Sequence, residues 1–324
     1  MSVWPLGGRG GSRTGNSSRT RNVLLLTIWP LFALICLGFV LSRRGFPDAG
    51  FWPAAERINY FVLFPALLVR NLAGAPLDDP AILRLGGAMV AVILMAFAAL
   101  SLIRLVRPMP AARFGPTVQG VIRFNTYLGL AVTSALTGPA GLERAAVCLA
   151  IGVPLVNVLS IMALTEGSAF RNPRLMLRTV FANPLILACI VGIALALLGT
   201  GLPFGIESFL TLIAQASLPL GLLCVGAALR PSALGQDGLA LTGTLALRLL
   251  AMPALAWLIA GLIGLGTTET LVLTVFAAIP TAPTAYVLTR QLGGDGTYMA
   301  GLITAQTMAA VVTIPVMLAL LGLA

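Results

Sequence analysis

Ten long apolar stretches, separated by short polar ones, follow one another along the chain. They lie at about residues 23–42, 51–72, 85–106, 116–137, 141–164, 179–199, 206–229, 239–264, 269–289 and 297–322. A helix that spans a bilayer needs about 20 residues that are mostly apolar, and each stretch is close to that length. The first one is longer than the core of a signal peptide and has no small-residue cleavage site after it. The pattern therefore predicts an all-α integral membrane protein with ten transmembrane helices.

The arginines are distributed unevenly between the loops. Those after even-numbered stretches hold Arg70, Arg84 and Arg144, whereas those after odd-numbered stretches hold eleven: Arg43, Arg44, Arg57, Arg104, Arg107, Arg113, Arg171, Arg174, Arg178, Arg230 and Arg290. Because positive residues collect in cytoplasmic loops, we expect a multi-pass protein of the cell inner (plasma) membrane with both termini outside the cytoplasm. Arginines within residues 1–22 favour the reverse orientation, but the loops are the stronger signal.

Composition excludes several classes of protein. Of the 324 residues, 58% are hydrophobic and only 9% are charged, against about a quarter charged in soluble domains. The chain has no histidine and its four cysteines stand singly, so we expect no enzyme, no cofactor and no metal site. The net charge of +10 comes from arginines between apolar stretches, so nucleic-acid binding is not expected.

One internal offset relates the two halves of the chain. A tripeptide, a glycine and a proline have counterparts 154 residues later. Trp-Pro-Leu at 29–31 corresponds to Asn-Pro-Leu at 183–185, Gly38 to Gly192, and Pro65 to Pro219. Five spans per half is an odd number, so the second half must cross the membrane in the opposite sense. We therefore expect a first five-helix repeat at 23–165, a cytoplasmic loop at 166–178 and a second, inverted repeat at 179–324. Residues 1–22 are expected to be a disordered tail, or the product of a start codon placed too far upstream.

The fourth and ninth stretches carry helix-breaking residues at matching places. The fourth reads RFNTYLG at residues 123–129 and the ninth reads IPTAPT at 279–284. Pro280 and Pro283 have no N–H to donate within a helix, and Gly129 marks the corresponding break in the fourth stretch. We therefore expect broken helices 4 and 9 that cross near the middle of the membrane, where irregular backbone survives only beside protein or water.

Such a crossing favours an anion. The N-terminus of each second half-helix brings partial positive charge and unpaired N–H groups to the shared centre. The residues expected to bind the substrate are Asn125, Thr126, Thr281, Pro283, Thr284, Gln306 and Thr307. The alternative for Asn125, Gln306 and Thr307 is a set of hydrogen bonds that hold the helices together. Arg248 is the one charge identified at depth, where it would pair with an anionic substrate or extend to the membrane surface.

The ten carboxylates all fall in loops or at the ends of the apolar stretches. Coupling of transport to protons through a titrating carboxylate is therefore not expected. Sodium held by backbone carbonyls stays open as a coupling ion.

The chain resembles the auxin efflux carrier family, which includes PIN-like carriers and bacterial malonate and organic-acid permeases. The resemblance covers nearly everything from residue 23 onward. It rests on YFVLFPALLVRN at 60–71, RFNTYLG at 123–129, SLPLG at 217–221, IPTAPTAYVLTRQLGGD at 279–295 and ITAQT at 303–307. It implies a scaffold from spans 1, 2, 6 and 7, a mobile transport unit from spans 3–5 and 8–10, and often a homodimer. The chain departs from the family in having Ala131 at the usual crossover proline and Thr284 where asparagine is common.

Together these features favour a secondary transporter that moves a small organic anion, a mono- or dicarboxylate, by alternating access. The alternative is a membrane protein of the same fold that binds or senses the anion without transporting it. Expected partners are the anion and the lipid bilayer, with a homodimer and a sodium ion as open additions.

Overall fold

The computed structural model describes residues 14–48, 50–75, 79–165, 183–202, 205–235 and 237–323. Within these residues every regular element is helical and no strand is found, which confirms the predicted all-α class. The helices are α1 (Thr14–Arg43), α2 (Phe51–Ile58), α3 (Phe64–Ala73), α4 (Pro80–Val106), α5 (Ala111–Ile122), α6 (Thr126–Thr165), α8 (Pro184–Leu198), α9 (Ile206–Ala227), α10 (Gly238–Ala246), α11 (Met252–Ile263), α12 (Thr267–Ala278), α13 (Thr284–Gln291) and α14 (Gly296–Leu320).

Short irregular segments join some of these helices into longer rods and bend another. A π-helical segment at Asn59–Leu63 joins α2 to α3, and another at Leu247–Ala251 joins α10 to α11, so each pair runs on as one rod. α6 is bent at Gly138, whose φ of 64° lies in the left-handed region, and this bend separates segments four and five. Six of the helical stretches are long and apolar enough to cross a membrane by themselves.

The predicted N-terminal tail and the predicted cytoplasmic loop fall only partly, or not at all, within the residues that the structure describes. Residues 1–13 of the expected tail and the expected loop at 166–178 lie outside the described residues. The rest of the expected tail differs from the prediction, because α1 already begins at Thr14.

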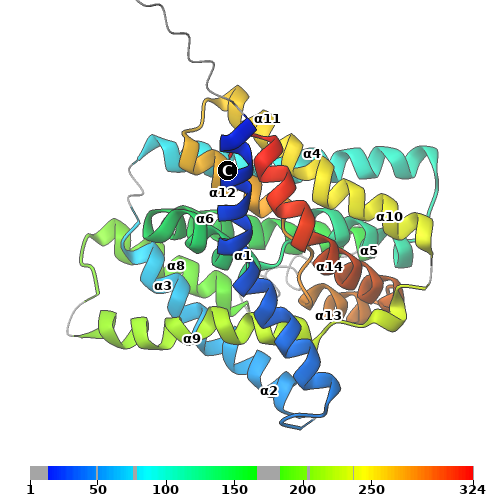
Figure 1. Cartoon of the computed structure of the whole chain (residues 1–324), viewed down its shortest axis with the longest axis horizontal. Coiled ribbons are helices and arrows are strands. Elements are labelled where there is room, and N and C mark those ends of the chain that lie inside the picture. The colour runs from blue at the N-terminus through cyan, green and yellow to red at the C-terminus, as the bar shows by residue number, and fades with distance from the viewer. Residues whose placement is uncertain are drawn as a thin grey trace, which may run out of the picture.

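The helices pack in two groups. α1 lies along α9, and α3 lies along both α8 and α9. In the second group α4 packs on α6 and α11, while α12 contacts α6, α11 and α14. Figure 1 shows α3, α8 and α9 gathered at the lower left and α4, α5, α10 and α14 on the right. This division agrees with the scaffold and transport unit that the family resemblance implies.

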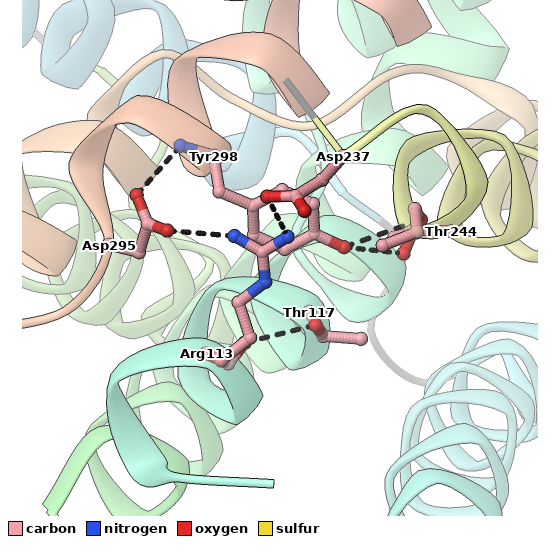
Figure 2. A network of polar contacts seen from close by, with 7 residues as sticks. Arg113, Thr117, Asp237, Thr244, Asp295 and Tyr298 are labelled. Carbon is pink, nitrogen blue, oxygen red and sulfur yellow. Dashed lines mark hydrogen bonds and ion pairs between the residues drawn. The ribbon is translucent and has the colours of Figure 1, made fainter.

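Polar contacts at the helix ends fix which loops share a side. Arg113, in the first turn of α5, forms ion pairs with Asp237 and Asp295, at 2.5 and 2.7 Å, and stacks on the ring of Tyr298 (Figure 2). The Tyr298 hydroxyl reaches Thr244 at 3.0 Å. The loops after segments three, seven and nine therefore meet on one side, which we call the odd-loop side. Arg144 and Glu269 pair across the loops after segments four and eight.

Two glycines allow close helix contacts at matching places in the two halves of the chain. A Cβ added at Gly38 would lie 2.0 Å from the Leu223 carbonyl oxygen, and one added at Gly192 would lie 3.3 Å from the Val69 backbone. The offset of 154 residues relates both members of these contacts, since 192 − 38 = 223 − 69 = 154. Each glycine lets its helix approach the partner backbone.

Replacing Gly38 with alanine should destabilise the protein, because the new methyl group overlaps backbone that cannot rotate away. Overpacking of this kind costs about 1–3 kcal/mol, so thermal unfolding in detergent should begin at a lower temperature. The matched control is Gly87→Ala, since a Cβ at Gly87 meets nothing within 4 Å. Equal melting of the two variants would show that α1 and α9 separate freely at this point.

Candidate functional site

The fourth membrane segment is broken between Ile122 and Thr126. α5 ends there, Arg123 adopts an extended conformation (φ −84°, ψ 133°), and α6 begins at Thr126. The N–H of Asn125 donates to the carbonyl of Pro280 at 2.8 Å, and its side-chain oxygen accepts from the N–H of Leu128 at 3.2 Å. The break forms without a proline, because Asn125 caps the second half-helix and its backbone bonds to the other broken helix.

The ninth segment is broken where its two prolines predict. α12 ends at Ala278 and α13 begins at Thr284. In an unbroken helix, residues 280 and 283 would donate to the carbonyls of Phe276 and Ile279, four residues earlier. Pro280 and Pro283 carry no N–H. Both carbonyls are therefore left without a helical donor inside the protein.

Arg248 supplies the missing donors. Its guanidinium donates to the carbonyls of Ile279 at 2.7 Å, Phe276 at 2.8 Å and Val121 at 2.8 Å. The side chain is 1% exposed, so it neither extends to the membrane surface nor faces a substrate. Both expectations for Arg248 are corrected: its charge lies against the C-terminal ends of α5 and α12, where helix dipoles favour a cation.

Gln306 and Thr281 form the second support of the crossing. The Gln306 side-chain oxygen accepts from the N–H of Thr281 at 2.9 Å and from its hydroxyl at 2.8 Å. The Gln306 amide nitrogen donates to the Gly120 carbonyl at 2.8 Å. Both side chains are fully buried and hold the crossing together, which matches the alternative interpretation of Gln306. Thr307 donates to the carbonyl of Ile303 in its own helix.

Gly129 has a different place from the one expected. It lies inside α6, three residues after the break, and its N–H donates to the Asn125 carbonyl at 2.9 Å. A Cβ there would lie 2.8 Å from the Ile279 side chain. Gly129 therefore permits close packing of the two broken helices and does not itself break the fourth one.

A cleft opens where the two breaks face α2, α6 and the start of α8. The cleft encloses about 520 Å³, counted with the solvent at its mouth. Its lining residues are Glu56, Tyr60, Arg123, Phe124, Asn125, Thr126, Tyr127, Val153, Val156, Asn157, Asn183, Leu185, Ala282, Pro283 and Thr284. Four of the expected substrate-binding residues thus share one cleft: Asn125, Thr126, Pro283 and Thr284.

Two donors in this cleft are free to bind an anion. The side chain of Asn125 is fully buried, and its amide nitrogen has no hydrogen-bond partner among the described residues. Among the residues that the structure describes, Arg123 makes two long hydrogen bonds, to Thr284 at 3.4 Å and Gln119 at 3.5 Å, although a guanidinium carries five N–H donors. The cleft therefore presents a positive charge and an unused amide beside the N-terminus of α6.

Several residues of the cleft were not identified as site residues from the sequence. Arg123 directly precedes the expected site, and its position at the helix break was the available signal. Nothing in the sequence pointed to Asn157 as a site residue, and Asn183 and Tyr60 stood out only in the internal repeat and in the family resemblance. Glu56 begins the second membrane segment yet lines the cleft, so a carboxylate does stand beside the expected binding residues.

Comparison with known protein families gives one match. Residues 168–318 match the family model described as membrane transport protein. The matched stretch includes the ninth segment with its two prolines, whereas the break in the fourth segment lies outside it. No curated protein matches the chain with significant similarity.

Proposed function

Since residues 168–318 place the chain in the auxin efflux carrier family of membrane transport proteins, we propose that it moves a small organic anion, a mono- or dicarboxylate, by alternating access. The chain is a multi-pass membrane protein of a transporter family and not an enzyme. The proposed substrate site is the cleft between the two broken helices. The proposed location is the cytoplasmic membrane, with the arginine-rich odd-loop side toward the cytoplasm.

The observation that carries this proposal is the unused Asn125 amide beside the Arg123 guanidinium. A buried polar group without a partner costs about 1–3 kcal/mol, and a carboxylate oxygen would relieve that cost. A second carboxylate oxygen suits the guanidinium, whose planar fork matches carboxylate geometry. Thr126 and Thr284 add hydroxyl groups at the same cleft. The amide N–H, the guanidinium and the two hydroxyls can all donate hydrogen bonds, so a small anion, which accepts them, fits best.

Two features support alternating access. The paired close contacts of Gly38 and Gly192 agree with two inverted repeats, the arrangement that alternating access uses. The two groups of helices also meet at a small residue: a Cβ at Gly221 of α9 would lie 2.7 Å from the ring of Tyr127 in α6. Because glycine has no side chain to interlock with the ring, this contact suits one group of helices sliding past the other.

Reconstituted in liposomes, the protein should move labelled malonate, malate or lactate at a rate that follows the membrane potential. Moving one charge through 100 mV changes the free energy by about 2.3 kcal/mol, so an imposed potential should alter the net flux of an anion strongly. Ligand-dependent thermal stabilisation without flux would favour the binding or sensing alternative. Neither flux nor stabilisation with a broad panel of carboxylates would overturn the proposal.

Asn125→Ala should reduce carboxylate transport about 10- to 100-fold. The variant loses one hydrogen bond to a charged acceptor, which contributes about 1.5–3 kcal/mol. Loss of the cap on Leu128 lowers stability by about 1 kcal/mol, so flux is normalised to folded protein. The matched control is Asn71→Ala, because Asn71 is also buried with an unpartnered amide nitrogen but lies outside the cleft. Equal flux in both variants would remove Asn125 from the site.

A further inference from the structure

A carboxylate stands where the substrate cleft meets a second hollow. This second hollow, the vestibule, encloses about 830 Å³ counted with the solvent at its mouth, and Trp52 and Arg230 are among its lining residues. Both residues lie next to loops that follow odd-numbered membrane segments, so the vestibule opens toward the odd-loop side. Glu56 and Pro283 line the cleft and the vestibule alike. An anion that moves between the two hollows therefore passes Glu56.

The Glu56 carboxylate has no partner. It is half-buried in α2, and among the described residues no hydrogen bond or ion pair reaches it. Neither guanidinium of the two hollows forms an ion pair with it among the described residues: Arg123 makes two long hydrogen bonds, to Thr284 and Gln119, and Arg230 donates to the Tyr286 hydroxyl at 3.2 Å. A half-buried carboxylate that forms no ion pair is poorly stabilised in its charged form.

The groups that face Glu56 leave it as the one that titrates with anion binding. From the cleft these are Tyr60, Arg123 and Tyr127, and from the vestibule Cys224, Arg230 and Tyr286. Arginine stays charged and tyrosine stays neutral near neutral pH. Two like charges about 6 Å apart, at an effective dielectric constant of about 20, repel enough to weaken binding about a hundredfold. Protonation of Glu56 would remove that repulsion.

We propose that Glu56 takes up one proton when a carboxylate enters the cleft, so that anion binding and proton binding are coupled. This inference rests on the proposed function and adds a coupled proton to it. The proton comes from solvent through the vestibule, binds one carboxylate oxygen of Glu56, and returns to solvent when the anion leaves. Affinity for the anion and affinity for the proton must then rise together, because linkage is reciprocal.

The test is the pH dependence of malonate binding to the purified full chain in lipid nanodiscs, followed by calorimetry. As the pH is raised through the titration of Glu56, affinity should fall by up to about tenfold per pH unit, and about a hundredfold in all, as one proton is bound with each anion. Glu56→Gln, which has the same shape without the charge, should bind malonate tightly at high pH with a flat profile. Any titration of malonate itself appears in both proteins and cancels in their comparison.

Three further variants separate this coupling from other causes. Glu56→Asp keeps a carboxylate at this position and should therefore show the pH dependence that Glu56→Gln lacks. Glu207→Gln removes an exposed carboxylate in the first turn of α9 and should leave the wild-type profile, as should Cys224→Ser. A flat profile in the wild-type protein would overturn the proton coupling while leaving the proposed function intact. Absence of binding for malonate, malate and lactate at every pH would overturn the proposed function itself, and the coupling with it.

Discussion

Arg123→Gln should reduce carboxylate transport by about 30-fold or more while leaving the folded protein as stable as the wild type. The guanidinium lines the cleft and makes only two hydrogen bonds, both at the long end of the range, so few native contacts are lost with it. Its main contribution would come when an anion binds. Removing one partner of a charge pair that is shielded from water costs about 2–5 kcal/mol of binding.

Flux of labelled malonate into liposomes and the melting temperature of the same preparations measure the two effects separately. Arg123→Lys keeps the charge but not the planar fork, so it should transport at an intermediate rate. Arg84→Gln is the control, because Arg84 is exposed and, within the described part of the chain, bonds to the Gly264 carbonyl alone, at 3.3 Å. If Arg123→Gln transports at the wild-type rate, the cleft between the broken helices is not the anion site.

The sequence predicted the parts of the fold that depend on local chemistry. The all-α class was predicted from the apolar stretches, and the missing N–H groups of Pro280 and Pro283 ended α12 where expected. The break in the fourth segment was also expected, although Gly129 was wrongly chosen as its marker. The sequence could not show that the backbone N–H of Asn125 bonds to the carbonyl of Pro280, because that partner lies far away in the chain.

The candidate site was predicted less completely, for a related reason. Asn125, Thr126, Pro283 and Thr284 share the cleft because they lie on the breaks themselves. Gln306 and Thr281 are polar residues near the same breaks, yet their groups bond to one another and to the Gly120 carbonyl. Composition does not reveal which polar side chains will form hydrogen bonds with unpaired backbone groups and which will keep their hydrogen-bonding groups free for a ligand. That division depends on the final position of each broken helix.

Arg248 shows the other outcome for a buried arginine. Arg123 and Arg248 both lie within membrane segments, but the guanidinium of Arg248 already donates to three carbonyls that the broken helices leave unpaired. Replacing it with leucine should therefore damage folding and not only transport. Buried carbonyls without partners cost about 1–3 kcal/mol each, and the loss of a buried charged partner costs about 3–5 kcal/mol. Arg248→Leu should lose a large share of the 5–15 kcal/mol that stabilises a typical protein.

The measurement is the melting temperature and the fraction of monodisperse protein after extraction in detergent. Arg248→Leu should melt about 10 °C lower or more and yield little folded protein, whereas Arg84→Leu should behave as the wild type. Arg248→Lys can reach fewer of the three carbonyls, so it should fall between them. Unchanged melting of Arg248→Leu would mean that other donors or lipid-borne water satisfy the carbonyls of Phe276 and Ile279. In that case the breaks would be held by Asn125 and Gln306 alone, and the crossing would not depend on a buried charge.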